Sequence, residues 1–274
     1  MMLKLKNVSK EIDGNLILNN VNFELPNSKI IGLVGRNGSG KTTLMKVIAS
    51  EMLPTSGKVD VAVEDVFYVD PLANFMTHYS PIAVADVLSS YMPKFNRNEF
   101  FDILGQSELP LKKTISSFSK GQQALLYIAC GIASGAKYIL LDEPLDGLDV
   151  FIKDRVKNLL IENVGRSEST VVIATHNLAE LDSLADSILF IKDNTVEMYD
   201  PEEEEQVKVQ FVYDEDELPS NLASVAKVIE KRGRVWLVIM PEDEIEKIFS
   251  DTSTYQFVEV LRVTTEDVFR TELG

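Results

Sequence analysis

The chain has 274 residues, 45% hydrophobic and 26% charged, which is enough to bury the core of one large domain or of a large and a small one. Its net charge of −16 argues against DNA or RNA as the main partner, because nucleic-acid-binding surfaces are basic. The single cysteine, Cys130, excludes an internal disulfide and fits a reducing compartment.

Cys130 lies in an apolar helical pattern, so we interpret it as a packed core thiol and not as a nucleophile. No signal peptide is expected at the N-terminus, where Lys4 and Lys6 interrupt a short alternating pattern. The longest apolar stretch, residues 125–141, is broken by two glycines and a lysine and is too short to cross a bilayer. Any membrane role is therefore expected to come through another polypeptide.

The first part of the chain predicts strands separated by turns. Alternating or β-forming residues occur at Leu3–Val8 and Leu16–Leu25, with the turn signal Asp13-Gly14 between them. A short apolar run, Ile30–Val34, predicts a strand buried on both faces. After the turn at residues 54–57, two more strands are predicted at Lys58–Val63 and Val66–Val69.

A glycine-rich segment follows the buried strand and leads into an apolar helical pattern. It has the phosphate-loop spacing G-x-x-x-x-G-K-[ST], from Gly35 to Thr42. Glycines let the backbone curl so that several N–H groups point at one anion, and the following helix adds the positive end of its dipole. We expect Lys41 to reach the β- and γ-phosphates of a nucleotide and the Thr42 hydroxyl to ligate Mg²⁺.

The pattern becomes helical after Pro71 and returns to alternating strands and helices at residue 137. We predict a helical insertion at about residues 72–134, with helices at Ile82–Tyr91, Arg97–Leu104 and Lys120–Ala133. Further predicted elements are the strand Lys137–Leu141, the helix Asp149–Val164, the strand Thr170–Ala174, the helix Asn177–Ala185 and the strand Ser187–Lys192. This alternation predicts an α/β fold with a mostly parallel sheet and helices on both faces.

An acidic run at residues 201–205 predicts a domain boundary. We interpret it as a solvated linker, with a binding role as the alternative. Strands at Val207–Tyr213, Val225–Ile229, Arg234–Ile239 and Gln256–Val263, a helix at Pro241–Phe249 and a terminal helix predict a small α+β domain over residues 206–274. Trp236 is expected in its core or at a domain contact. The larger domain is expected to cover residues 1–200.

Two carboxylates and a histidine stand where predicted sheet strands end. Asp142 and Glu143 follow the apolar run Tyr138–Leu141, and His176 follows the strand that ends at Ala174. Beside a phosphate loop, Asp142 is placed to bind nucleotide-bound Mg²⁺, Glu143 to activate a water as general base, and His176 to contact a γ-phosphate. A solvated carboxylate cluster is the alternative for the pair. His78 has no such setting and stays unassigned.

In these motifs the chain resembles the nucleotide-binding subunit of an ATP-binding cassette (ABC) transporter. Its motifs occur in the same order as in the family, over about residues 1–200. Gly35–Thr43 matches Walker A, Phe118–Gln122 the signature usually written LSGGQ, and Ile139–Glu143 Walker B. Asp146–Asp149 matches the D-loop and Thr175-His176 the switch histidine. The resemblance implies a P-loop ABC cassette with an N-terminal antiparallel β-subdomain and a helical insertion.

The same resemblance implies the site residues, the cofactors and the partners. ATP and Mg²⁺ would be bound by the Walker A residues Gly35, Asn37, Gly38, Ser39, Gly40, Lys41, Thr42 and Thr43 together with Asp142, and the catalytic pair would be Glu143 and His176. A second cassette, identical or different, would pack head to tail, so that Ser119, Gly121 and Gln122 close over its ATP. Transmembrane permease subunits would place the chain in the cytoplasm, at the inner face of the cell membrane.

Two positions depart from the family pattern. Ile12 stands where an aromatic residue usually stacks on adenine. Asp70-Pro71 stands where the Q-loop glutamine is expected; Asp70 either approaches Mg²⁺ or belongs to a turn with no metal role. The C-terminal segment Thr264–Gly274 resembles the tail of bacterial exporter cassettes, which favours an exporter over an importer.

Two other functions are alternatives to transport. An ABC protein acting on ribosomes or DNA usually carries paired cassettes, a charged linker or a coiled coil, whereas this chain has one cassette and a net charge of −16. A regulatory cassette without hydrolysis is disfavoured by intact Glu143 and His176.

Overall fold

The computed structural model describes residues 2–69, 76–200, 205–250 and 254–273. Contacts divide the chain into two compact units, one of Met1–His176 with Leu184–Met198 and one of Asn177–Ser183 with Tyr199–Gly274. Among the residues so described, no helix combines the length and the apolar character needed to cross a membrane.

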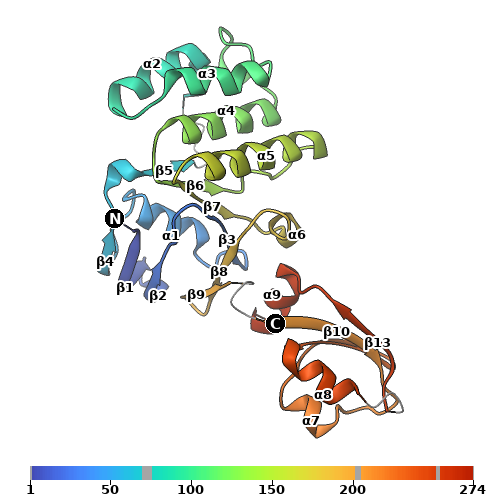
Figure 1. Cartoon of the computed structure of the whole chain (residues 1–274). Helices are drawn as coiled ribbons and strands as arrows, with labels where there is room; N and C mark the ends of the chain where they lie inside the picture. The colour runs from blue at the N-terminus through green and yellow to red at the C-terminus, as the bar shows by residue number, and fades with distance from the viewer. Residues whose placement is uncertain (1, 70–75, 201–204, 251–253, 274) are drawn as a thin grey trace. The chain divides into compact units, whose positions relative to one another are not determined.

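The first unit is built on a six-stranded sheet of order β5-β6-β7-β3-β8-β9 (Figure 1). Its strands are β3 (Ile30–Gly35), β5 (Val66–Val69), β6 (Tyr138–Asp142), β7 (Thr170–Ala174), β8 (Ser187–Lys192) and β9 (Thr195–Tyr199). The pairs β5–β6, β6–β7, β7–β3 and β3–β8 are parallel. Every residue of β3, β6 and β7 is buried, because both faces of the sheet are covered.

A three-stranded antiparallel sheet of order β2-β1-β4 accompanies this core, with β1 at Lys4–Ile12, β2 at Asn15–Glu24 and β4 at Ser56–Asp60. The turn between β1 and β2 has positive φ at Asp13 (50°) and Gly14 (78°). Two left-handed residues make the tight hairpin turn whose twist matches that of the flanking strands. The predicted turn signal therefore lies at the hairpin tip.

Strand β6 shows which layer covers each face of the main sheet. Tyr138 and Leu140 belong to a buried cluster with residues of β1, β2 and the helix α1 (Lys41–Ile48). Ile139 points to the other face, where a Cβ added to Gly131 of α4 (Lys120–Ala133) would meet its side chain at 3.0 Å. Successive side chains of a strand alternate between faces, so the sheet lies between two layers. Helix α5 (Val150–Arg166) also contacts β3 and β7.

The helical insertion consists of α2 (Pro81–Tyr91), α3 (Arg97–Gln106), the 3₁₀ turn η3 (Ile115–Ser117) and α4. The side chains of Ser80 and Asn96 accept hydrogen bonds from backbone N–H groups of the first turns of α2 and α3. Buried Asp65, in the 3₁₀ turn η1 (Val63–Asp65), joins the insertion to the sheet, since it accepts from Lys94 at 2.9 Å and from Lys137 at 2.7 Å. Hydrogen bonds from these two lysines hold the pKa of Asp65 below its ordinary value.

The second unit contains a four-stranded antiparallel sheet of order β11-β12-β10-β13. Its elements are β10 (Gln206–Val212), α7 (Ser220–Ala223), β11 (Lys227–Arg232), β12 (Val235–Pro241), the 3₁₀ turn η4 (Glu242–Glu244), α8 (Ile245–Phe249), β13 (Gln256–Leu261) and α9 (Thr265–Leu273). The core includes Phe211, Met240 and Tyr255, with Phe211 and Tyr255 packed edge to face at 5.5 Å. Trp236 is 5% exposed and lies in this core, as one of the two sequence interpretations expected.

Some elements differ from the sequence expectation. The helix predicted at Asn177–Ala185 is only α6 (Leu178–Leu181), and the Asp182 side chain just beyond it bonds to the backbone of α9. Strand β9 was not predicted; it follows β8 through Asp193 and Asn194, both with positive φ. The helix predicted from Pro241 begins later, because Pro241 pairs with Gln206 at the end of β12. Cys130 is buried in α4, which confirms its interpretation as a core thiol; burial raises the pKa of that thiol.

Candidate active site

Three neighbouring parallel strands end at the same edge of the main sheet. In the order β6-β7-β3, the first ends with Asp142 and is followed by Glu143, the second is followed by Thr175-His176, and the third by the phosphate loop. Backbone hydrogen bonds hold these ends together, since the N–H of Glu143 donates to the Ala174 carbonyl at 2.9 Å and that of Thr175 to the Leu33 carbonyl at 3.3 Å. Segments far apart in sequence thus meet where parallel α/β sheets bind ligands.

The loop before α1 has a conformation that only glycine adopts easily. Gly40 has φ of +104°, and a Cβ at this position would lie 2.9 Å from Cγ2 of Ile17. Ile17 sits at a register irregularity of β2, between the pairs Lys10↔Leu18 and Glu11↔Leu16. No side chain caps the N-terminus of α1, so its N–H groups and dipole remain available to an anion.

Lys41 and Ser39 line the curve of this loop. The Lys41 ammonium donates to the carbonyls of Gly35 at 2.8 Å and Arg36 at 3.3 Å, and the residue is 8% exposed. The Ser39 hydroxyl oxygen is buried and has no hydrogen-bond partner within the described structure. A cation on backbone carbonyls beside an unsatisfied hydroxyl suits an anionic ligand with several acceptor oxygens.

Asp142 connects the loop to β6. Its Oδ2 accepts a 2.6 Å hydrogen bond from the Thr42 hydroxyl and a 3.5 Å contact from the Tyr68 hydroxyl. The residue is 9% exposed. Sequence reasoning had named Thr42 and Asp142 but missed Tyr68. The sequence signal that could have indicated Tyr68 was its position in the strand predicted just before the helical insertion. That strand is β5, which pairs with β6.

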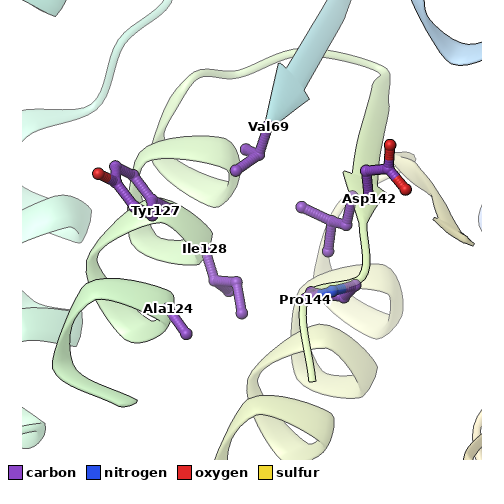
Figure 2. A pocket seen from close by; sticks show the side chains of 7 residues that line it. Val69, Ala124, Tyr127, Ile128, Asp142 and Pro144 are labelled. Atoms are coloured by element: carbon purple, nitrogen blue, oxygen red, sulfur yellow. The ribbon is translucent and has the colours of Figure 1, made fainter. Parts of the chain in front are cut away.

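A small apolar pocket lies behind Asp142, between α4 and the ends of β5 and β6 (Figure 2). Val69, Ile128 and Pro144 surround it, while the carboxylate of Asp142 points away from it. One side of Asp142 is therefore apolar. Apolar surroundings screen charge less than water does, so they strengthen the interaction of the carboxylate with a cation.

Glu143 and His176 form a close pair. Nδ1 of His176 lies 3.0 Å from Oε2 of Glu143, and the two side chains are 56% and 28% exposed. Glu143 has φ of +50°, an uncommon left-handed conformation for a non-glycine residue and one found at functional sites. The hydrogen bond from His176 to Glu143 and the charge of Glu143 raise the pKa of His176; Asp146 adds to this and Lys41 opposes it.

The signature segment begins α4 with a reciprocal cap. Ser119 accepts from the Gln122 N–H at 3.2 Å, and the Gln122 side chain accepts from the Ser119 N–H at 3.1 Å. Gly121 lies against α5, where an added Cβ would meet two Ile152 carbons at 3.2 Å. Lys120 lies over the D-loop, because an added Cβ on Gly147 would be 3.3 Å from its ammonium.

The predicted site residues fall into two groups. The structure brings the phosphate loop, including Asn37, Gly38 and Thr43, to one sheet edge with Asp142, Glu143 and His176. Among the described residues, no hydrogen bond or ion pair joins Ser119 or Gln122 to that loop. Asp70 lies outside the described residues, so its metal role remains a prediction.

The sequence was also compared with known proteins. The ABC transporter family model matches residues 18–146. The zinc import ATP-binding protein ZnuC of Wigglesworthia glossinidia brevipalpis is 30% identical over 69% of this chain and 82% of its own. This chain belongs to the ABC transporter ATP-binding family. The ABC transporter ATP-binding protein YtrB of Bacillus subtilis (strain 168) is 28% identical over 100% of this chain and 98% of its own.

Other comparisons cover the ABC part of the chain. The lantibiotic transport ATP-binding protein SrtF of Streptococcus pyogenes is 29% identical over 71% of this chain and 89% of its own. A solved structure described as an ATP-binding subunit of an ABC transporter has a TM-score of 0.65 at 19% identity, covering 73% of this chain and 90% of its own. It confirms the predicted cassette fold.

Membership of the ABC transporter ATP-binding family establishes the general activity of the chain. The chain binds ATP and hydrolyses it to drive transport, as the sequence resemblance implied. ATP-binding subunits of this family work with transmembrane permease subunits.

Proposed function

We propose that this ABC protein is the ATPase subunit of an exporter, lying at the inner face of the cell membrane against separate permease subunits. The resemblance of its C-terminal segment, 264–274, to exporter tails supports the direction of transport. A similar protein, SrtF, is named for lantibiotic transport.

We assign triphosphate binding to the phosphate loop. Lys41, the buried Ser39 hydroxyl and the uncapped N-terminus of α1 supply positive charge and donors for the β- and γ-phosphates. Oxygen ligands are what Mg²⁺ prefers, and the Thr42 hydroxyl and the Asp142 carboxylate, 2.6 Å apart, provide them. Bound Mg²⁺ would neutralise charge on the phosphates. Asp70 is a further proposed ligand.

We assign the water-activating role to Glu143. Its carboxylate accepts a proton from the attacking water, whose oxygen forms a bond to the γ-phosphorus while the bond to the bridging oxygen of ADP breaks. His176 holds Glu143 through Nδ1, which leaves Nε2 to face the γ-phosphate.

We further propose that two cassettes, from this chain alone or with a related one, close head to tail around ATP. Ser119, Gly121 and Gln122 would then meet the triphosphate of the other cassette. Among the described residues, no hydrogen bond or ion pair joins Ser119 or Gln122 to the loop of their own chain, and this supports the arrangement together with the capped N-terminus of α4.

The Glu143–His176 pair beside Asp142 is the observation that carries the proposal. The test compares ATP hydrolysis by the wild-type protein, Glu143→Gln and the exposed control Glu168→Gln. Glu143→Gln keeps the shape of the side chain but removes the base, so turnover should fall by about 10²-fold or more while ATP still binds. Gel filtration with ATP should then show a trapped dimer. An unchanged hydrolysis rate in Glu143→Gln would remove this residue from the catalytic role.

A further inference from the structure

The segment that follows His176 belongs to a different compact unit from His176 itself. His176 groups with the first unit, whereas Asn177–Ser183 groups with the C-terminal sheet and helices, and Leu184 returns to the first unit. The sequence had placed the whole stretch inside the ATPase domain. One peptide bond therefore separates the proposed phosphate-sensing side chain from the C-terminal unit.

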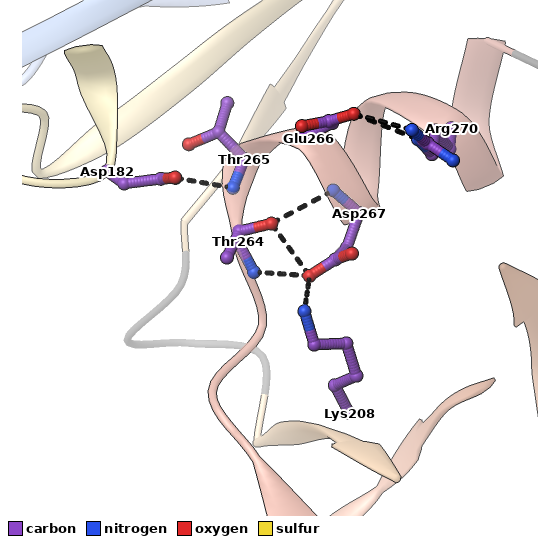
Figure 3. Close-up of polar contacts among 7 residues, drawn as sticks. All are labelled: Asp182, Lys208, Thr264, Thr265, Glu266, Asp267 and Arg270. Carbon is purple, nitrogen blue, oxygen red and sulfur yellow. Dashed lines mark hydrogen bonds and ion pairs between the residues drawn. The ribbon is translucent and has the colours of Figure 1, made fainter. Parts of the chain in front are cut away.

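This segment is held by α9. Helix α6 packs against α9, and Leu181 and Val268, one from each helix, are almost fully buried. Oδ1 of Asp182 accepts a 2.6 Å hydrogen bond from the N–H of Thr265, the first residue of α9 (Figure 3). That N–H is one of the groups a helix cannot satisfy internally, and Thr265 is buried, so the bond is strongly favoured.

Helix α9 is in turn fixed to the C-terminal sheet. Asp267 accepts from the N–H of Thr264 at 2.9 Å, while its own N–H donates to the Thr264 hydroxyl at 3.3 Å, a reciprocal cap. The same carboxylate accepts from the Lys208 ammonium of β10 at 2.6 Å (Figure 3). Burial alone would raise the pKa of Asp267, but the bonds from Lys208 and Thr264 outweigh it and lower that pKa.

A continuous set of bonds thus runs from β10 through α9 to Asp182, and the chain runs from Asp182 back to His176. We propose that Asp182 is a positioning residue, through which the C-terminal unit sets how the His176 imidazole meets Glu143. The proposal rests on the roles assigned to Glu143 and His176 above. It gives the C-terminal unit a function through the covalent bond that joins Asn177 to His176.

A purely structural role for Asp182 would have different consequences. As a helix cap alone, it would stabilise the C-terminal unit without altering the histidine. The imidazole resonances of His176 separate the two roles. The chain has two histidines, and His78→Gln assigns the signals.

The test uses the whole 274-residue chain, four single variants and the double variant Asp182→Ala/Thr265→Pro. Asp182→Ala removes the acceptor and Asp182→Asn keeps a side-chain oxygen. Thr265→Pro removes the donor at a helix position that tolerates proline. Asp216→Ala is the matched control, because it breaks an exposed ion pair with Lys231 in the same unit. The measurements are the pKa of His176 by NMR, kcat and KM for ATP, and amide exchange in α9.

We expect Asp182→Ala and Thr265→Pro to bring the pKa of His176 towards its ordinary value. Each should lower kcat on the order of 10-fold with KM unchanged, short of the roughly 100-fold that a 1 Å misplacement can cost. The double variant should lose no more than either single one, because both delete one bond. Asp182→Asn should retain most of the wild-type pKa of His176 and most of the wild-type kcat. Asp216→Ala should behave as wild type.

The proposal is overturned if the pKa of His176 and kcat stay at wild-type values while amide exchange shows that the start of α9 has opened. It is equally overturned if only the alanine variant acts and Thr265→Pro does not. Failure of the proposed catalytic roles is a separate result, seen as full hydrolysis by His176→Ala. The NMR measurement needs no hydrolysis, so it still decides whether Asp182 positions the ring.

Discussion

The Nδ1 atom of His176 lies 3.0 Å from Oε2 of Glu143, at the ends of the neighbouring strands β7 and β6. The contact joins a group that titrates near neutral pH to a carboxylate in a left-handed backbone conformation. The protonation state of His176 therefore decides how strongly Glu143 is held.

The pKa of His176 should exceed its ordinary value of about 6.5, because Glu143 stabilises the imidazolium. For a group whose pKa is raised by folding, the contribution to folding free energy is complete below the unfolded-state pKa. It is lost as pH rises through the folded-state pKa. An NMR titration should show the raised pKa, and Glu143→Gln should lower it towards the ordinary value of a histidine. An unshifted His176 in the wild-type protein would contradict the pairing.

Gly40→Ala should weaken ATP binding more than 10-fold. The substitution places a Cβ 2.9 Å from Ile17 in a backbone with φ of +104°, and the left-handed region costs a non-glycine residue about 1–2 kcal/mol. Gly165→Ala in α5 is the matched control, since nothing lies within 4 Å of an added Cβ and φ is not positive there. Calorimetric titration with ATP compares the two. Equal affinities would show that the loop tolerates the change.

Ile17→Ala added to Gly40→Ala should restore only part of the affinity, because it removes the contact but leaves the backbone strain. Full recovery would assign the whole effect to the contact. No recovery would assign it to the backbone.

Ile12→Ala should reduce affinity for ATP and GTP by similar, few-fold factors, and the wild-type protein should accept GTP nearly as well as ATP. Ile12 is half-buried at the end of β1, and an apolar side chain packs on a purine ring without reading its edge. Competition binding measures the ratio of the affinities for ATP and GTP. The control is Val63→Ala, a substitution at an exposed residue. A strong preference for ATP would mean that another residue reads the base.

Ser119→Arg should leave ATP affinity of the monomer almost intact yet abolish hydrolysis. The loop residues proposed to hold the triphosphate lie on one chain, whereas Ser119 is proposed to meet the phosphate of another. The change also removes the cap of α4, which costs on the order of 1 kcal/mol. The control is Ser90→Arg, at an exposed position of α2. Full activity of Ser119→Arg would contradict the proposed arrangement.

Mixing Ser119→Arg with Lys41→Ala protein gives a sharper version of that experiment. Mixed dimers would contain one intact composite site, so the hydrolysis rate should rise and then fall with the mixing ratio. Zero activity at every ratio, with mixed dimers shown to form, would mean that both sites must work together or that sites are not shared.

Local features of this ABC protein followed from the sequence alone. The glycine spacing before Lys41, the apolar runs of β3 and β6, and the cap at Ser119 are set by residues close together in the chain. Backbone geometry, helix capping and side-chain periodicity act over a few residues, so their patterns are legible without a fold. The order of the family motifs then predicted the family and the cassette fold, which the comparisons confirm.

Other features depended on which distant segments came together. The contact of Tyr68 with Asp142 exists because β5 lies beside β6. Ile17 packs on Gly40 because of a register irregularity in β2. The hydrogen bond that Asp182 accepts from Thr265 forms because α6 packs against α9. Sheet order and helix pairing minimise the exposed apolar surface of the whole chain, and no local pattern encodes that outcome. These contacts, including the one through which we propose that His176 is positioned, were therefore decided by the tertiary structure.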